Sequence, residues 1–198
     1  GGVYAGRVRE VAVTVGDGCR VGVVVGSGGG KSVTGLALLG LLPRATARVR
    51  GAIRFQGEDL SSLPASRLRR LRGSEISMIF QEPMSALDPV FTIGEQLTET
   101  LRSHRKISRK DARERAVEAL AEVGIPSPRQ RLDDYPYQFS GGMRQRVMIA
   151  MALICRPKLV IADEPTTALD VTVQAQIIDL LCEISDHTGT APLFITHA

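Results

Sequence analysis

The stretch that decides the fold is residues 23–34, "VVVGSGGGKSVT". It joins an apolar run to a glycine-rich loop, and Gly30, Lys31 and Ser32 then open an apolar segment of helical length. A strand that ends in such a loop and opens a helix brings several backbone N–H groups to one point, which attracts phosphate. The lysine of such a loop reaches the β- and γ-phosphates, and the hydroxyl that follows it binds Mg²⁺. The stretch therefore predicts a nucleotide site.

A second motif, residues 159–165 "LVIADEP", places two adjacent carboxylates after four apolar residues. The carboxyl ends of strands are where open α/β sheets bind ligands. In a site for a nucleotide and a metal, Asp163 is predicted to hold Mg²⁺ through water. Glu164 is predicted to polarise the attacking water as a general base.

A third motif, residues 140–146 "SGGMRQR", is a serine and two glycines at a predicted helix start. The N-terminus of a helix favours anions because its first N–H groups are unpaired and its dipole is positive there. The segment is thus either a second phosphate-binding helix start, distinct from the one at Ser32, or a simple N-cap followed by glycines.

Hydrophobic periodicity places the motifs on alternating strands and helices. Predicted strands are 3–15 and 19–25 around a tight turn, 51–57, 76–80, 159–162 and 193–196. Predicted helices are 32–42 with a stop at Pro43, three that begin near Thr92, Ser108 and Ser140, and 172–186. This order indicates a mostly parallel sheet that is interrupted by a helical insertion.

Composition excludes several classes of protein. Lys and Arg number 25 against 21 Asp and Glu, and the basic clusters are interrupted, so a nucleic-acid partner is not predicted. The longest apolar runs, 33–43 and 147–155, have about half of the ~20 residues that a membrane span needs. No signal peptide is recognisable, and the three isolated cysteines suggest neither a zinc site nor disulfides. Both chain ends are expected to be cut points within a longer domain.

Six ordered elements resemble the nucleotide-binding subunit of ATP-binding cassette (ABC) transporters. They are the P-loop at 25–32, Gln81 in "MIFQEP", "FSGGM" at 139–143, "LVIADE" at 159–164, "ALD" at 168–170 and His197 in "FITHA". Within that family, "QEPMSALDPVFTIGEQL", "YPYQFSGGMRQRVMIAMAL" and "DEPTTALDVTVQAQI" resemble the dipeptide/oligopeptide (and nickel) importer ATPases.

The resemblance implies an α/β fold of the P-loop NTPase (RecA-like) type. It implies a mostly parallel sheet core with N-terminal antiparallel β strands and a helical subdomain insertion. We expect residues 1–198 to form one ABC ATPase domain. Residues 1–81 and 156–198 would form the nucleotide-binding core, and residues 82–155 the helical signature subdomain.

The resemblance also implies ATP and Mg²⁺ as cofactors and a role for each motif residue. The ATP-binding residues would be Gly26, Ser27, Gly28, Gly29, Gly30, Lys31, Ser32 and Val33. Mg²⁺ would be held by Ser32, Gln81 and Asp163, and the catalytic residues would be Glu164, Gln81 and His197, the last at the γ-phosphate. The signature residues Ser140, Gly141, Gly142 and Met143 would act on the partner's nucleotide, and Asp170 would support the partner across the interface.

The implied assembly is a transporter at the cytoplasmic face of the cell membrane, where this subunit would be peripheral. A second ABC ATPase subunit, identical or paralogous, would pair with it head to tail. Two permease subunits would bind it through coupling helices that dock on residues 82–105. An extracytoplasmic solute-binding protein would act through the permease. The implied activity is ATP hydrolysis that powers the import of di- or oligopeptides.

Departures from the family pattern leave alternatives open. Val25 stands where the family has the first P-loop glycine, and a β-branched residue forced to positive φ costs about 1–3 kcal/mol. Ala198 follows the histidine where the family usually has aspartate. The alternatives are an importer of nickel or another solute, and a subunit whose hydrolysis is impaired by the altered P-loop. A soluble ABC ATPase acting on DNA or ribosomes is disfavoured, because only a compact helical insertion separates residues 32 and 140.

Overall fold

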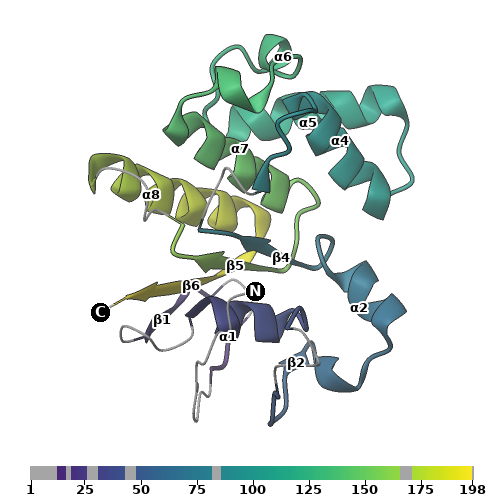
Figure 1. The fold of residues 1–198 in the computed structure, drawn as a ribbon, viewed down its shortest axis with the longest axis vertical. Helices are drawn as coiled ribbons and strands as arrows, with labels where there is room; N and C mark the ends of the chain where they lie inside the picture. The colour runs from purple at the N-terminus through teal and green to yellow at the C-terminus, as the bar shows by residue number, and fades with distance from the viewer. Residues whose placement is uncertain are drawn as a thin grey trace.

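The computed structural model describes residues 13–16, 19–25, 31–42, 48–81, 86–165 and 171–197. Its centre is a four-stranded sheet in which every pairing is parallel (Figure 1). The strand order is β1 (Val21–Val25), β6 (Ala191–His197), β5 (Leu159–Asp163) and β4 (Ile76–Ile79). The predicted parallel sheet is confirmed, and its last strand is longer than the predicted 193–196.

Alternate residues of the strands lie in two separate hydrophobic cores, one on each face of the sheet. On β5, Val160 and Ala162 belong to the core on the side of the helical insertion, whereas Ile161 belongs to the core beneath α1. All three are fully buried. A strand buried on both faces reads as a continuous apolar run, which is why "LVIA" was recognisable in the sequence.

Helix α1 (Lys31–Leu38) lies on one face of the sheet and α8 (Val171–Thr188) on the other (Figure 1). A Cβ on Gly35 would lie 2.9 Å from the Met78 methyl carbon, so this glycine lets α1 approach the sheet closely. The predicted end of α1 was wrong. The helix stops at Leu38, because Gly40 takes φ +62° and the Leu41 N–H donates to the Leu36 carbonyl at 2.8 Å. This Schellman motif ends the helix before Pro43 is reached.

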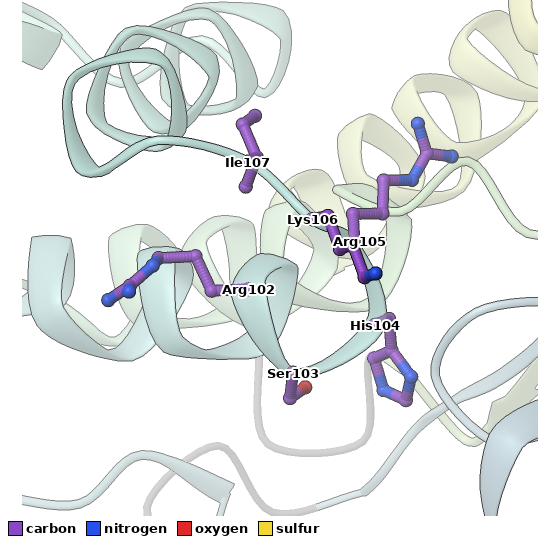
Figure 2. A pocket seen from close by; sticks show the side chains of 6 residues that line it. All are labelled: Arg102, Ser103, His104, Arg105, Lys106 and Ile107. Carbon is purple, nitrogen blue, oxygen red and sulfur yellow. The ribbon is translucent and has the colours of Figure 1, made fainter.

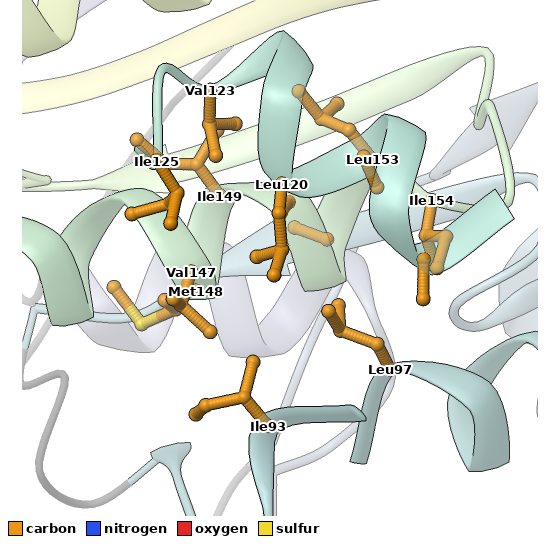
Figure 3. Packing of buried hydrophobic residues seen from close by; sticks show 14 of the residues in the cluster. Ile93, Leu97, Leu120, Val123, Ile125, Val147, Met148, Ile149, Leu153 and Ile154 are labelled. Carbon is orange, nitrogen blue, oxygen red and sulfur yellow. The ribbon is translucent and has the colours of Figure 1, made fainter. Parts of the chain in front are cut away.

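Between β4 and β5, the described residues form four helices. They are α4 (Ile93–His104), α5 (Arg109–Glu122), α6 (Pro128–Arg131) and α7 (Gly141–Leu153). The predicted caps Thr92, Ser108 and Ser140 all accept a hydrogen bond from the first turn of their helix. Figure 3 shows the packing among these helices, with Leu97, Leu120 and Ile149 pointing into one apolar core. The helical insertion is confirmed, and the domain boundaries at 82 and 155 stay a prediction.

Residues 51–57 do not form the single predicted strand. They contribute β2 (Arg54–Phe55), which pairs antiparallel with β3 (Glu58–Asp59). Gln56 and Gly57, at φ 50° and 80°, make the reversal between the two strands. The 3-10 helix η1 (Leu60–Ser62) and α2 (Ala65–Leu71) follow, and a second 3-10 helix, η2 (Pro136–Gln138), precedes α7.

The predicted N-terminal strand pair is described only in part. Across the predicted turn, the Cys19 N–H donates to the Gly16 carbonyl at 3.0 Å, and residues 17 and 18 lie outside the described residues. Residues 13–16 before it are irregular rather than a strand, and residues 3–12 lie outside the described part of the chain.

Candidate functional site

The parallel register brings the predicted catalytic segments to one edge of the sheet. Val25, which leads into the P-loop, pairs with His197 at the end of β6. Asp163 at the end of β5 pairs with Ile195, two residues before His197. The carboxyl ends of β1, β6 and β5 are therefore neighbours, where an open parallel sheet binds ligands.

Two carboxylates are buried at this edge. Asp163 is 3% exposed and Glu164 is 6% exposed. Glu164 has φ 44°, a left-handed backbone that costs a non-glycine residue about 1–3 kcal/mol and is held only where its surroundings enforce it. One such constraint is the Glu164 N–H, which donates to the Ile195 carbonyl at 2.9 Å. The residue predicted to be the general base therefore has a strained backbone, a property it shares with Gln56, Ser127 and Arg156 elsewhere in the chain.

Gln81 completes the group from the neighbouring strand. It follows β4, whose Ile79 pairs with Ala162 of β5. The half-buried Gln81 amide donates from Nε2 to Glu164 Oε2 at 3.2 Å. The structure therefore brings together two residues that are 83 positions apart in the sequence. This hydrogen bond holds the Glu164 carboxylate in one orientation.

The concern about Val25 is not supported by its backbone. Val25 is the last residue of β1 and lies in register with His197. An extended strand is the conformation in which β-branched residues are favoured. The strain expected from a valine at positive φ therefore does not arise at this position.

Several predicted site residues are described only in part or not at all. Lys31 and Ser32 are the first two residues of α1, Val33 is half-buried in its first turn, and His197 ends β6. The side chains of Lys31, Ser32 and His197, all of residues 26–30, and Asp170 lie outside the described residues. Their predicted roles stay predictions.

The signature segment forms the start of α7, as predicted. Ser140 caps the helix, accepting from the Met143 N–H at 3.3 Å. Ser140 and Gly141 are exposed, and an added Cβ on Gly141 would meet nothing within 4 Å. A Cβ on Gly142 would lie 3.6 Å from Val173 of α8. Nothing within the described chain therefore requires glycine at position 141.

The side chains at this edge of the sheet offer oxygen ligands of the kind that Mg²⁺ prefers. Asp163 offers carboxylate oxygens and Gln81 an amide oxygen, which are the hard ligands that Mg²⁺ prefers. No group of three His, Cys, Asp or Glu side chains able to hold a metal occurs among the described residues. A site with few protein ligands is typical of Mg²⁺, which keeps waters and binds substrate phosphates.

Sequence reasoning missed Gln145, which is 1% exposed on α7. Its amide Nε2 donates to the carbonyl of Pro165, the residue after Glu164. A signal was present in the sequence. Gln145 occupies the apolar stripe of α7 with Met148, Ile149 and Ala152, all buried, and a polar residue on such a stripe needs a partner.

A groove of about 840 Å³ lies over α4 and α5. Its lining includes Phe91, Thr98, Arg102 and Arg109. Gln96 holds the turn that precedes α4 in place. Its amide donates to the Asp88 and Phe91 carbonyls at 2.8 and 3.0 Å. This turn presents an exposed apolar pair, with Val90 73% and Phe91 48% exposed.

A smaller hollow of about 310 Å³ lies where α4 connects to α5. Figure 2 shows that its basic side chains point in different directions. Arg105 turns back to donate to the Cys155 carbonyl at 2.7 Å, and the His104 ring lies against Gly73. Burial lowers the pKa of His104. Because the cations do not converge, this hollow lacks the geometry of an anion site.

A family model described as "ABC transporter" matches residues 8–167. The chain belongs to the ABC transporter family. The fold agrees, since the chain is similar to the dimeric ATP-binding cassette MJ0796, in a post-hydrolysis state bound to ADP and Pi, with a TM-score of 0.81. That likeness has 27% identity and covers 96% of this chain and 80% of the other. CbiO1 of Clostridium perfringens, part of the ABC transporter complex cbiONQ, gives a TM-score of 0.79 at 25% identity, over 96% of this chain and 72% of the other.

Curated relatives of this ABC chain carry peptide-transport names. The dipeptide transport ATP-binding protein DppD of Bacillus subtilis is 52% identical over 191 residues, which are 96% of this chain and 57% of the relative. A probable peptide ABC transporter ATP-binding protein, y4tR of Sinorhizobium fredii, is 53% identical over 89% of this chain and 53% of its own length. The chain thus spans about half the length of these relatives. In its described part, every helix is too short or too polar to cross a membrane.

Proposed function

We propose that the chain binds and hydrolyses ATP as the motor subunit of an importer of di- or oligopeptides. The observation that carries the proposal is the Gln81–Glu164 hydrogen bond beside buried Asp163, at the sheet edge where β1 leads into the P-loop. Membership of the ABC transporter family supports the nucleotide, and the names of the relatives support peptide cargo over nickel or other solutes.

Glu164 is the proposed general base for water attack on the γ-phosphate. A base must be held within reach of the proton it accepts, and two constraints hold Glu164. Its N–H is fixed to β6 and its carboxylate to Gln81. Phosphoryl transfer depends mainly on positioning and charge stabilisation, so a rigid carboxylate suits the reaction. His197, at the end of the adjacent strand, is the proposed partner at the γ-phosphate.

The nucleotide would be bound by the loop between β1 and α1. Backbone N–H groups of residues 26–30 would surround the phosphates, Lys31 would pair with the β- and γ-phosphates, and Val33 would lie in the same first turn. Asp163, Ser32 and Gln81 would hold Mg²⁺. When bound, Mg²⁺ neutralises charge on the β- and γ-phosphates. The extended backbone at Val25 supports a working loop rather than an impaired one.

The start of α7 is the proposed contact for the nucleotide of a second ATPase subunit. Ser140 and Gly141 are exposed, and Gly141 has open space where a side chain would stand. Open space is what a phosphate of another subunit needs for close approach. The dimeric form of the related cassette supports pairing with a second subunit. In the proposed head-to-tail pairing, Met143 and Asp170 would also lie at the interface.

The groove over α4 and α5 is the proposed docking surface for the permease. An apolar side chain of a coupling helix fits Phe91. Side chains of either charge can pair with the rest of the lining, which includes the exposed residues Glu95, Glu99, Arg102 and Arg109. Two permease subunits would seat two copies of this domain at the cytoplasmic face of the membrane. The extracytoplasmic solute-binding protein would act through the permease, without contact with this chain.

The test is Glu164→Gln in the purified protein, assayed with its partner subunits. We expect nucleotide affinity to be retained and Mg²⁺-dependent turnover to fall roughly 100-fold or more, since a general base contributes that much. The matched control is Glu183→Gln, which changes an exposed carboxylate on α8 and should leave both properties unchanged. Normal turnover in Glu164→Gln would reject Glu164 as the base.

The cargo needs its own experiment. Vesicles that hold the assembled transporter should take up labelled di- or oligopeptides with ATP inside, and the uptake should stop with Glu164→Gln. Uptake of nickel in place of peptides would assign the alternative cargo and overturn the peptide proposal while leaving the ATPase intact.

A further inference from the structure

Gln145 is the buried polar residue that joins the signature helix to the catalytic turn. It lies on α7, five positions after the cap Ser140, and is 1% exposed among apolar neighbours. Burying an amide lowers the stability of the fold unless the amide makes hydrogen bonds. Gln145 satisfies this by donating from Nε2 to the Pro165 carbonyl, 20 residues further along the chain.

The acceptor of this bond lies next to Glu164. The turn that follows β5 is therefore fastened on both sides of the carboxylate: the Glu164 N–H is bound to Ile195 of β6, and the Pro165 carbonyl is bound to Gln145 of α7. Glu164 lies between these two anchors with its left-handed φ of 44°. A strained backbone persists only where its neighbours over-determine it, and Gln145 supplies one of the constraints.

We propose that Gln145 is a positioning residue that sets the orientation of Glu164 for water attack. This inference rests on the proposed role of Glu164 in ATP hydrolysis. Gln145 does not contact nucleotide in this account and acts only through the turn. Removal of its amide donor leaves the Pro165 carbonyl without this anchor, so the Glu164 carboxylate departs from its reactive position.

The same hydrogen bond links the start of α7 to the turn that carries Glu164 within one subunit. Ser140 and Gly141 begin the helix that carries Gln145, and a helix transmits displacement over one turn as a rigid body. A nucleotide bound at the start of α7 therefore biases the turn that carries Glu164 of that subunit. The Gln145 side chain makes this connection through its bond to Pro165.

The experiment is Gln145→Met, which keeps length and apolar packing but removes the donor. We expect kcat to fall roughly 10- to 100-fold, as small misplacement of a catalytic group does, with ATP affinity unchanged. Thr190→Val is the matched control. Thr190 is 1% exposed, its hydroxyl donates to the Pro157 carbonyl at 2.7 Å, and this bond lies at the opposite end of β5. The control should lower thermal stability to a similar degree and leave kcat unchanged.

A double-mutant cycle separates positioning from general weakening of the fold. If Gln145 acts through Glu164, adding Gln145→Met to Glu164→Gln causes no further loss of the residual turnover. An additive loss, a loss of ATP affinity, or unchanged kcat in Gln145→Met would overturn the inference. If Gln145→Met does not fold, Gln145→Asn replaces it, because this variant keeps a polar amide but is one methylene too short to reach the Pro165 carbonyl.

The two hypotheses fail differently. Normal turnover in Glu164→Gln rejects the proposed function itself. Loss of turnover in Glu164→Gln together with wild-type kcat in Gln145→Met rejects only the positioning role.

Discussion

The N-termini of α4 and α7 differ in how their backbone N–H groups are used. At α4, Thr92 and Glu95 form a closed capping box in which each side chain binds the other's backbone N–H. At α7, Ser140 caps a single N–H at 3.3 Å, and two glycines follow it. The first turn of α7 holds a cation, Arg144, instead of an acid. The start of α4 is closed by its own side chains, whereas α7 has one capped N–H and no acidic side chain in its first turn.

Helix α5 supports the same distinction. Ser108 caps it by accepting from the Asp111 N–H at 3.0 Å, and the acid of the first turn is Asp111. Both α4 and α5 therefore carry the negative charge that complements a helix dipole, and α7 does not. The proposed anion for the start of α7 is the phosphate of the partner's ATP.

The largest expected effect on turnover comes from placing an acidic side chain in the first turn of α7. Gly141→Asp places a carboxylate where nothing lies within 4 Å, so the monomer should be unchanged or more stable by up to ~1 kcal/mol. Turnover should fall roughly 100-fold or more, because the added carboxylate competes for the backbone N–H groups at the helix start and repels the phosphate. Chemical denaturation and steady-state ATPase assays measure the two quantities. Wild-type turnover would show that α7 does not meet an anion.

A smaller effect is expected from removing single caps. Ser108→Ala should cost about 1 kcal/mol of unfolding free energy and leave turnover unchanged, as loss of a structural cap does. Ser140→Ala should cost no more stability, yet lower turnover roughly 10- to 100-fold, since hydrogen bonds to charged groups are the stronger ones. Equal effects of the two substitutions on turnover would remove the distinction between the helices.

The smallest effect concerns pH at α4. Hydrogen bonds from the Thr92 backbone and hydroxyl lower the pKa of Glu95 below its usual 4.5. A lowered folded-state pKa contributes stability that is present above the unfolded pKa and is lost as pH falls through the folded pKa. The stability difference between the unmodified protein and Glu95→Gln should therefore be present at neutral pH and shrink below about pH 4. A difference that stays constant down to pH 2 would contradict the capping role of the carboxylate.

The sequence was sufficient where local chemistry decides the structure. The buried strands at Ile76 and Leu159 were visible as apolar runs, and the caps Thr92, Ser108 and Ser140 as helix-start residues. Their positions follow from short-range hydrogen bonds and hydrophobic patterning. The order of strands and helices then gave the parallel sheet.

The sequence was insufficient where a backbone conformation or a distant contact decides. The apolar pattern of α1 continues to Leu42, so the sequence did not reveal that the helix ends before Gly40. The end depends on the left-handed backbone of Gly40 and on the hydrogen bond from Leu41 to Leu36. Residues 51–57 read as one strand because Gln56 gives no sign of its left-handed φ. The bond from Gln145 to Pro165 depends on the packing of α7 beside the end of β5, which no local pattern encodes.

The central claim is that α7 of one subunit completes the ATP site of another. The most direct measurement is the mass of Glu164→Gln by light scattering, alone and mixed with the second ATPase subunit, before and after ATP is added. We predict that ATP doubles the mass of Glu164→Gln, and that adding Gly141→Asp abolishes the doubling although ATP still binds. Doubling that persists in the double variant would contradict the claim.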